Sequence, residues 1–172
     1  YVDNPVVRAA LSANTLNIRQ DYERSHLIGA TASTAMGEWI LRSEFAYETD
    51  RYHRTQMKLP GVVKSDVVSS VIGLDWQGWS DQFVSLQWFH ISRLENTDGM
   101  INKAEEDSIS LLWESKFLNE TLSVKWLQVE SLNHEDGQSQ LKLTYNLESN
   151  IDLYMGADLF HGDKKQPFGQ FD

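Results

Sequence analysis

From residue 26 onward, apolar and polar residues alternate with a period of two, which is the pattern of β-strands with one buried face. The alternation predicts eight strands of about ten residues, longer than is usual in soluble sheets and long enough for tilted strands to cross a bilayer. The predicted strands cover about residues 25–35, 38–49, 66–77, 82–93, 107–116, 121–132, 138–147 and 150–160.

The predicted connections alternate in length along the chain. The short ones lie at 36–38, 78–81, 118–120 and 148–150, and the longer ones at about 50–65, 94–106, 133–137 and after residue 160. Tight turns on one side and longer loops on the other are typical of outer-membrane barrels. A soluble β-sandwich has no reason to sort its loops in this way.

Residues 1–24 form a less regular lead-in. Pro5–Asn14 is a short apolar stretch behind a proline, and it is compatible with a few helical turns. The organisation expected is therefore a single β-barrel domain or fragment over residues 1–172, with strands in 25–160 and a loop in 161–172.

Six aromatic residues lie within a few positions of a short turn. On a closed sheet they would form a ring at one end, as in the aromatic girdle where a barrel meets the lipid–water boundary. The alternative is six core aromatics of a sandwich, but core residues would not favour one end. The girdle candidates are Trp39, Trp76, Trp79, Phe83, Phe117 and Tyr145.

The polar faces of the predicted strands carry charges of both signs. In a barrel this face lines the lumen, and in a sandwich it would face solvent. The assignment keeps mid-strand charges off the lipid face, where Arg or Lys would cost roughly 2–4 kcal/mol. The lumen candidates are Arg42, Glu44, Glu48, Asp75, Glu114, Lys125, Lys142, Asp152 and Asp158.

Composition narrows the function classes. The chain has 172 residues, no cysteine and a net charge of −10, which excludes disulfide and thiolate chemistry and argues against a nucleic-acid binder. No apolar run is long enough for a transmembrane helix. The mean hydropathy of −0.44 still fits a membrane barrel, because only every second strand residue has to be apolar.

His90 and Ser92 are the one pair with the residue types for nucleophilic catalysis. They share a strand face, and Asn96 or Asn102 would be the group that orients the imidazole. The competing interpretation, which we favour, is an interfacial histidine beside Trp88. No catalytic residue, enzymatic activity, cofactor or metal site is therefore predicted. The other histidines, His26, His53, His134 and His161, have no ligand spacing.

Two loops carry concentrated charge. The segment 50–65 contains Arg51, His53, Arg54, Lys58 and Lys64, which on an outer surface would bind lipopolysaccharide phosphates, although a solvated loop is the preferred interpretation. The segment 95–107 is acidic, but it lacks the ligand alternation of a calcium loop.

The C-terminal segment Gly156–Asp163 (GADLFHGD), followed by Phe168–Phe171 (FGQF), resembles the signature of a proteobacterial outer-membrane β-barrel family of unassigned function. Residues 26–30, 39–47 and 73–76 also resemble that family, and the likeness covers most of 19–172. The family implies a final strand after the FGQF motif and further strands upstream. The chain is therefore expected to be the C-terminal part of a larger barrel.

The resemblance also implies a location in the bacterial outer membrane. The expected partners are the lipid bilayer and lipopolysaccharide, with an outer-membrane lipoprotein or an exporter as a further candidate. The expected function is a porin-like channel or an export-associated barrel. The rivals are a phospholipase-like hydrolase using His90 and Ser92, and a soluble β-sandwich binding module.

Overall fold

The computed structural model describes residues 2–12, 15–56, 61–95 and 97–171, and these residues form an all-β fold. Its strands are β1 (Val2–Ser12), β2 (Thr15–Ser25), β3 (Leu27–Met36), β4 (Trp39–Arg54), β5 (Val62–Trp76), β6 (Gln82–Arg93), β7 (Glu105–Phe117), β8 (Leu122–Ser131), β9 (Asp136–Glu148) and β10 (Ile151–His161), and a short 3-10 helix η1 (Gly169–Phe171) follows. Within the described ranges, no helix has the length and apolar character needed to span a membrane.

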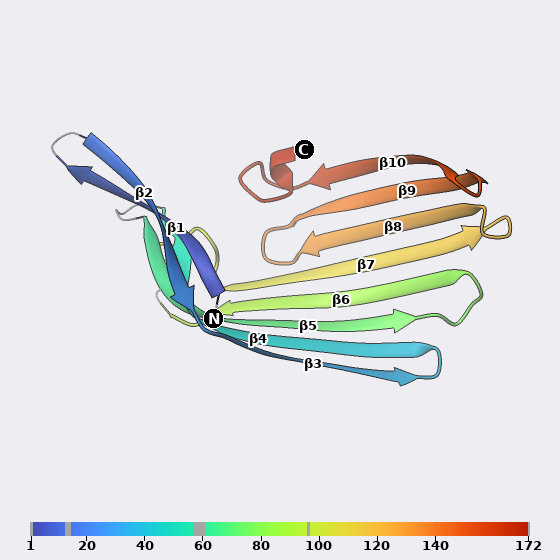
Figure 1. Cartoon of the computed structure of the whole chain (residues 1–172), viewed down its shortest axis with the longest axis horizontal. Helices are drawn as coiled ribbons and strands as arrows, with labels where there is room; N and C mark the ends of the chain where they lie inside the picture. Colours follow the sequence, from blue (N-terminus) through green and yellow to red (C-terminus); the bar gives the residue numbers. More distant parts are fainter. Residues whose placement is uncertain (1, 13–14, 57–60, 96, 172) are drawn as a thin grey trace. The chain divides into compact units, whose positions relative to one another are not determined.

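The strands β3 to β10 form one antiparallel sheet in which every strand pairs with its neighbours in sequence (Figure 1). This meander confirms the eight predicted strands. β3 and β10 are the two ends of the strand order, and no pairing between described residues joins them, so the sheet is open. A β-sandwich divides its strands between two sheets, whereas these eight belong to one.

β1 and β2 pair with each other in a separate two-stranded sheet. The helical turns expected in Pro5–Asn14 are therefore wrong over the described residues 5–12, which belong to β1. Proline is compatible with a strand here because each strand of a two-stranded sheet has one unpaired edge. A residue whose N–H would face that edge can be proline without the loss of an interstrand hydrogen bond. Ala13 and Asn14 lie outside the described residues.

The connection lengths agree with the prediction except at β8–β9. The connections at 55–61 and 94–104 are long, and those at 37–38, 118–121 and 149–150 are short. Residues 132–135 close a turn as tight as the one at 118–121, where a longer loop was expected. Glu135 adopts a left-handed backbone conformation there, with φ 54°.

The chain divides into two compact units. Unit 1 comprises Tyr1–Thr31, Glu44–Ser70 and His90–Glu106, and unit 2 comprises Ala32–Ser43, Val71–Phe89 and Asp107–Asp172.

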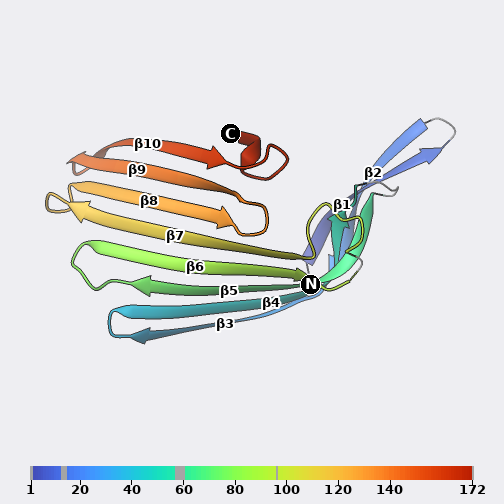
Figure 2. The ribbon, with the colours of Figure 1, turned by 180° about the vertical axis from the view of Figure 1, so that it is seen from behind.

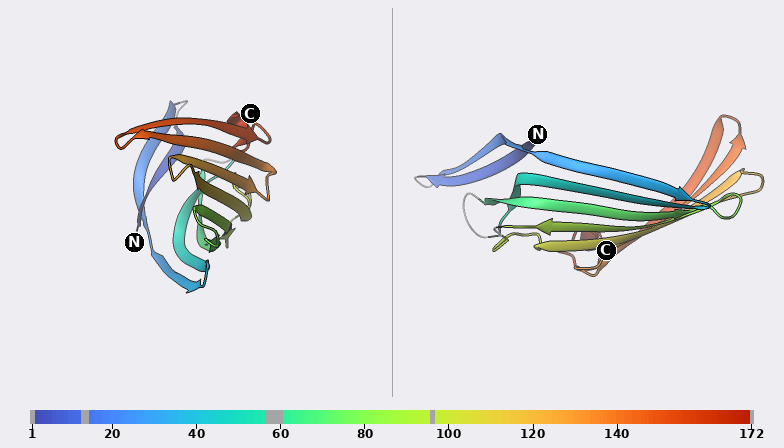
Figure 3. Two further views of the ribbon diagram at one scale, coloured as in Figure 1. Left: turned by 90° about the vertical axis from the view of Figure 1, so that its right-hand side faces the viewer. Right: turned by 90° about the horizontal axis from the view of Figure 1, so that it is seen from below.

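In unit 2 the strand register sorts side chains into an apolar face and a polar face. On the apolar face Leu122 lies opposite Tyr145, Val124 opposite Leu143 and Trp126 opposite Leu141. The row continues into β10, where Met155 faces Leu143. The pairing of β9 with β10 can be followed in Figure 2 and, from two further directions, in Figure 3.

In unit 1 an irregularity in β4 changes which residues share a face. Asp50 adopts a left-handed conformation with φ 53°, as the extra residue of a β-bulge often does. As a result Glu48 before it and His53 after it are both buried, although they are an odd number of residues apart. The bulge thus places a carboxylate and an imidazole on the same side of the strand.

Candidate functional site

Few side chains among the described residues are buried, and most of those are polar, which is unusual for a water-soluble protein. Among the described residues, only Val67 and Met100 are buried apolar side chains. Large apolar side chains are exposed on most strands, among them Ile28, Leu41, Phe45, Ile72, Leu86, Leu153, Met155 and Leu159. The buried polar residues are Ser25, Glu48, His53, Ser65, Asp75, Ser85, Arg93, Ser115 and Asp136. Exposed apolar surface of this extent is typical of faces that contact a membrane or another protein.

Arg42 and Asp75, two of the predicted lumen residues, form an ion pair in unit 2. The Nη2 of Arg42 donates to Oδ1 of Asp75 at 2.9 Å, and Asp75 is only 5% exposed. Gly73 lies beside them, where a Cβ would make ordinary van der Waals contact with the Gln87 side chain at 3.4 Å and the Arg42 side chain at 3.9 Å. The polar face therefore holds a partly buried charge pair.

Three further lumen candidates meet in neighbouring strands of unit 2. The Nζ of Lys125 lies 4.0 Å from Oε2 of Glu114. Lys125 is also directly opposite Lys142 in the β8–β9 register, so two like charges face each other. Lys142 places its ammonium 5.4 Å from the centre of the Tyr154 ring. We call Glu114, Lys125 and Lys142 the lysine cluster.

The remaining lumen candidates are separate from these. Glu48 lies in unit 1, where it accepts a hydrogen bond from Ser25 Oγ at 2.8 Å. Asp152 and Asp158 are exposed in β10 and accept hydrogen bonds from Asn146 and Gln140 respectively. Glu44 is exposed in β4.

The predicted girdle residues form two groups and one separate residue. The Trp76 ring lies 6.1 Å from Trp39 and 5.0 Å from Trp79, centre to centre. In the strand register, Phe117 pairs with Leu122, and Leu122 pairs with Tyr145. Phe83, by contrast, lines a pocket beside Glu114 and Lys116.

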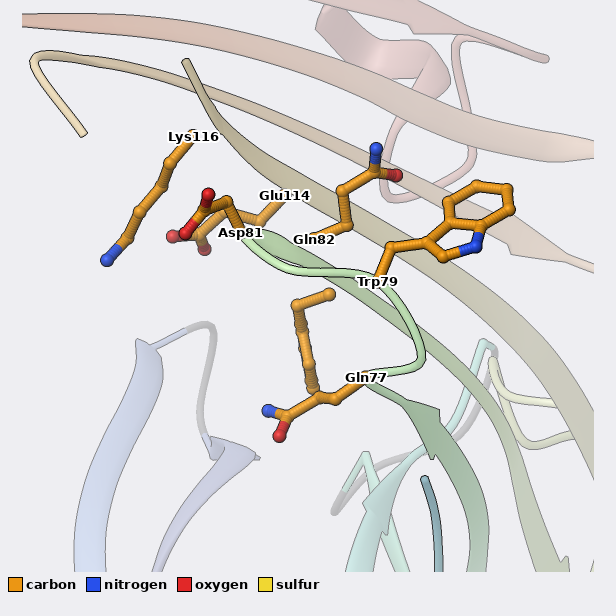
Figure 4. Close-up of a pocket in the computed structure, with 7 residues that line it drawn as sticks. Gln77, Trp79, Asp81, Gln82, Glu114 and Lys116 are labelled. Carbon is orange, nitrogen blue, oxygen red and sulfur yellow. The ribbon is translucent and has the colours of Figure 1, made fainter. Parts of the chain in front are cut away.

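That pocket lies at the β5–β6 connection and measures about 350 Å³. In Figure 4, Asp81 and Glu114 lie close together, and the Trp79 indole points away from Lys116. Lys116 donates to Glu120 at 2.8 Å, which raises the pKa of the lysine and lowers that of the carboxyl group. Residues Gln77, Trp79, Asp81, Gln82, Phe83, Glu114 and Lys116 line the pocket.

A second pocket, in unit 1, gathers side chains that the sequence did not connect. It measures about 410 Å³ and lies where β4 and β6 end, and we call it the arginine pocket. The segment 99–101 closes it by pairing with β4: the Ile101 amide donates to the Arg54 carbonyl, and the Gln56 amide donates to the Gly99 carbonyl. The lining residues are Arg51, Tyr52, His53, Arg54, Arg93, Ile101 and Asn102.

Arg93 and His53 are the buried members of the arginine pocket, each 8% exposed. Arg93 donates from Nη1 to the Lys103 carbonyl at 2.6 Å and from Nη2 to Glu106 at 3.0 Å. Burial, together with the positive charges of Arg93 and Arg51, lowers the His53 pKa to about 4, so the imidazole is neutral at pH 7.

The charged residues of the two loops make contacts that the sequence did not predict. Arg51, His53 and Arg54 belong to the arginine pocket, Lys64 lies 3.6 Å from Asp50, and Lys58 is outside the described residues. In the acidic loop, Glu106 pairs with Arg93. No group of three or more His, Asp or Glu side chains within the described ranges is arranged to hold a metal ion.

His90 and Ser92 lie two residues apart in β6, as the sequence required. Asn102, one of the two residues considered for orienting the imidazole, instead donates to Glu106 at 3.3 Å. The other, Asn96, is outside the described residues.

Comparison with known proteins gave no relative from which a role could be transferred: no family model, no curated protein and no solved structure matches the chain.

Proposed function

We propose that the eight-stranded sheet is part of the wall of a transmembrane β-barrel in the bacterial outer membrane, and that its polar face lines a channel. The single observation that carries the proposal, which we call the reversed burial, is that large apolar side chains are exposed along the strands while the few buried side chains are mostly polar. In water this arrangement would leave several rows of apolar side chains exposed to solvent. In a bilayer the same rows face acyl chains, and the charges face a polar interior.

The dimensions of the apolar face support a membrane-spanning role. In β10 the apolar residues run from Ile151 to Leu159. At about 3.4 Å per residue this is roughly 27 Å along the strand, or about 21 Å along the membrane normal at a tilt of about 40°. This height is close to the band of about 25 Å found in outer-membrane barrels.

Polar and aromatic residues bound the apolar face at both ends. On β8 and β10 it ends where Glu130 pairs with His161 at 3.1 Å and accepts a hydrogen bond from Gln128. At the tight-turn end, Trp76 and Trp79 form the aromatic cluster expected at a lipid–water boundary. The segments proposed to cross the membrane lie between these limits.

Closure is the condition that the proposal places on the sheet. An edge with unpaired N–H and C=O groups is not tolerated in lipid. The edges of β3 and β10 must therefore pair with each other or with strands outside this chain. The likeness of the C-terminal segment to an outer-membrane barrel family favours additional strands, with transport or export as the role and lipid, lipopolysaccharide, an outer-membrane lipoprotein or an exporter as partners.

The test is insertion and conductance of the full chain. We expect the purified protein to require detergent, and to insert into phosphatidylcholine vesicles so that it becomes resistant to added protease in its strands but not in its long loops. A chain that remains monomeric in buffer without detergent and stays fully protease-sensitive beside vesicles would contradict the proposal. Inserted protein that conducts no ions would contradict the channel while leaving the barrel wall intact.

A further inference from the structure

The arginine pocket in unit 1 has the size of a small-molecule site. Its volume of about 410 Å³ falls in the range of ligand pockets. Three guanidinium groups line it from β4 and β6, and Tyr52 and Ile101 add an aromatic and an aliphatic wall. A pocket lined by several cations and by apolar side chains is suited to an organic anion.

Two buried nitrogen atoms in this pocket have no partner among the described residues. They are Nε of Arg93 and Nε2 of His53. The two Nη groups of Arg93 are already used by Lys103 and Glu106, so Nε remains the spare donor. A buried polar group without a hydrogen bond costs about 1–3 kcal/mol, and in a native structure it calls for an explanation. A bound acceptor would supply one.

The charge balance selects the sign of the ligand. Glu106 neutralises Arg93 at 3.0 Å, and Glu48 lies 3.5 Å from Arg51. Arg54 has no carboxylate partner within the described ranges. Because His53 is neutral near pH 7, the pocket carries one uncompensated positive charge. Guanidinium groups bind phosphate and carboxylate oxygens through paired hydrogen bonds, which lysine does not match.

We propose that the arginine pocket binds the phosphoryl group of an organic phosphate, with Arg54 and Arg51 on its exposed side and the organic part against Tyr52 and Ile101. A phosphomonoester carries a charge of about −1.5 to −2 and three strong acceptor oxygens, which suits several convergent donors better than a carboxylate does. The site is separate from the lysine cluster, and its binding does not depend on the protein conducting ions.

The test is calorimetric titration of glycerol 3-phosphate into the full chain in detergent micelles, with glycerol as the probe that lacks the phosphoryl group. We expect saturable binding of the phosphate only. Arg54→Gln should weaken it about tenfold or more, the effect of losing a charge-assisted hydrogen bond. Arg54 is exposed, so this variant should fold.

The matched control is Arg19→Gln, which removes a guanidinium of unit 1 outside the pocket. It should change the affinity by less than about twofold, because only a long-range charge is lost. Binding that is absent in the unaltered chain, or that Arg19→Gln weakens as much as Arg54→Gln, would overturn the proposal.

A second arm identifies the source of the phosphoryl group. The same titration is made with the chain in phosphatidylcholine vesicles with and without phosphatidic acid, which presents a lipid-borne phosphomonoester. Loss of glycerol 3-phosphate binding when phosphatidic acid is present supports the pocket and assigns it to a lipid headgroup. Unchanged binding supports the pocket and assigns it to a soluble phosphate.

Discussion

The arginine pocket of unit 1 and the lysine cluster of unit 2 each contain a pair between a basic side chain and a glutamate, but in opposite settings. The Arg93 side chain is 7% exposed and holds Glu106 at 3.0 Å, whereas the Lys125 side chain is 47% exposed and lies 4.0 Å from Glu114. A buried charge without a partner lowers the stability of the protein strongly, whereas an ion pair exposed to solvent contributes almost nothing to stability. The difference teaches that alternation along strands places charges on one face. Whether a loop covers those charges then decides how much an ion pair among them contributes to stability.

The largest expected effect on stability comes from breaking the buried ion pair between Arg93 and Glu106. Arg93→Met leaves Glu106 without its cation, and we expect the free energy of unfolding to fall by about 3–5 kcal/mol. Lys125→Met removes the exposed ammonium and should cost less than about 1 kcal/mol. Urea titration of both variants in detergent measures the two values. Equal losses would show that burial does not separate the two sites.

The next effect tests whether unit 2 depends on its aromatic cluster rather than on its charges. Trp76→Ala removes both ring contacts of the cluster, and we expect a loss of about 1–3 kcal/mol, since each aromatic pair contributes about 0.5–1.5 kcal/mol. The matched change Phe83→Ala removes a ring that lines the pocket with Glu114. If Phe83→Ala reduces vesicle insertion as much as Trp76→Ala does, Phe83 belongs to the girdle.

The pH dependence of the stability tests the buried site in unit 1. His53 has a folded pKa of about 4 beside Arg93 and Arg51, with Glu48 and Glu106 opposing them more weakly. Because the unfolded histidine binds its proton near pH 6.5, the unfolded state holds more protons between these values, and stability falls as the pH drops from about 6.5 to 4. His53→Gln should flatten this part of the unfolding curve. An unaltered pH slope in that variant would contradict the assignment.

The smallest expected effect on stability lies in the lysine cluster. Lys142→Glu turns a like-charge pair with Lys125 into an opposite-charge pair and should stabilise by about 0.2–1 kcal/mol. Lys125→Glu places two carboxylates together at Glu114 but also turns the pair with Lys142 into an opposite-charge pair, so it should change stability less than Lys142→Glu does. Both variants should shift the ion preference of reconstituted protein toward cations. Unchanged selectivity would remove these residues from the channel lining.

Periodicity was sufficient for the eight-stranded meander, because alternation in segments such as Leu141–Leu147 has no other regular interpretation. It also placed Arg42 and Asp75 on the polar face, where they pair. It could not predict the bulge at Asp50, since a single left-handed residue leaves no period. Polar residues from Thr49 onward therefore suggested a loop, although β4 continues to Arg54.

The sequence could not predict the arginine pocket, for a related reason. Arg93 is the last residue of β6, and its partners Lys103 and Glu106 lie across the following connection. The pairing of residues 99–101 with residues 54–56 brings that connection back to the end of β4. Such a contact depends on loop closure, for which neither a period of two nor a motif provides a signal.

The most direct test of the reversed burial is the depth of single tryptophans in a bilayer. Two variants of the full chain keep only Trp126 or only Trp79, with phenylalanine at the other five positions, and are inserted into vesicles whose lipids carry bromine near the headgroup or deep in the acyl chain. The account predicts that deep bromines quench Trp126 more strongly, because it lies within the apolar face of β8, and that shallow bromines quench Trp79 more strongly. Fluorescence of Trp126 that no bromolipid quenches would contradict the account.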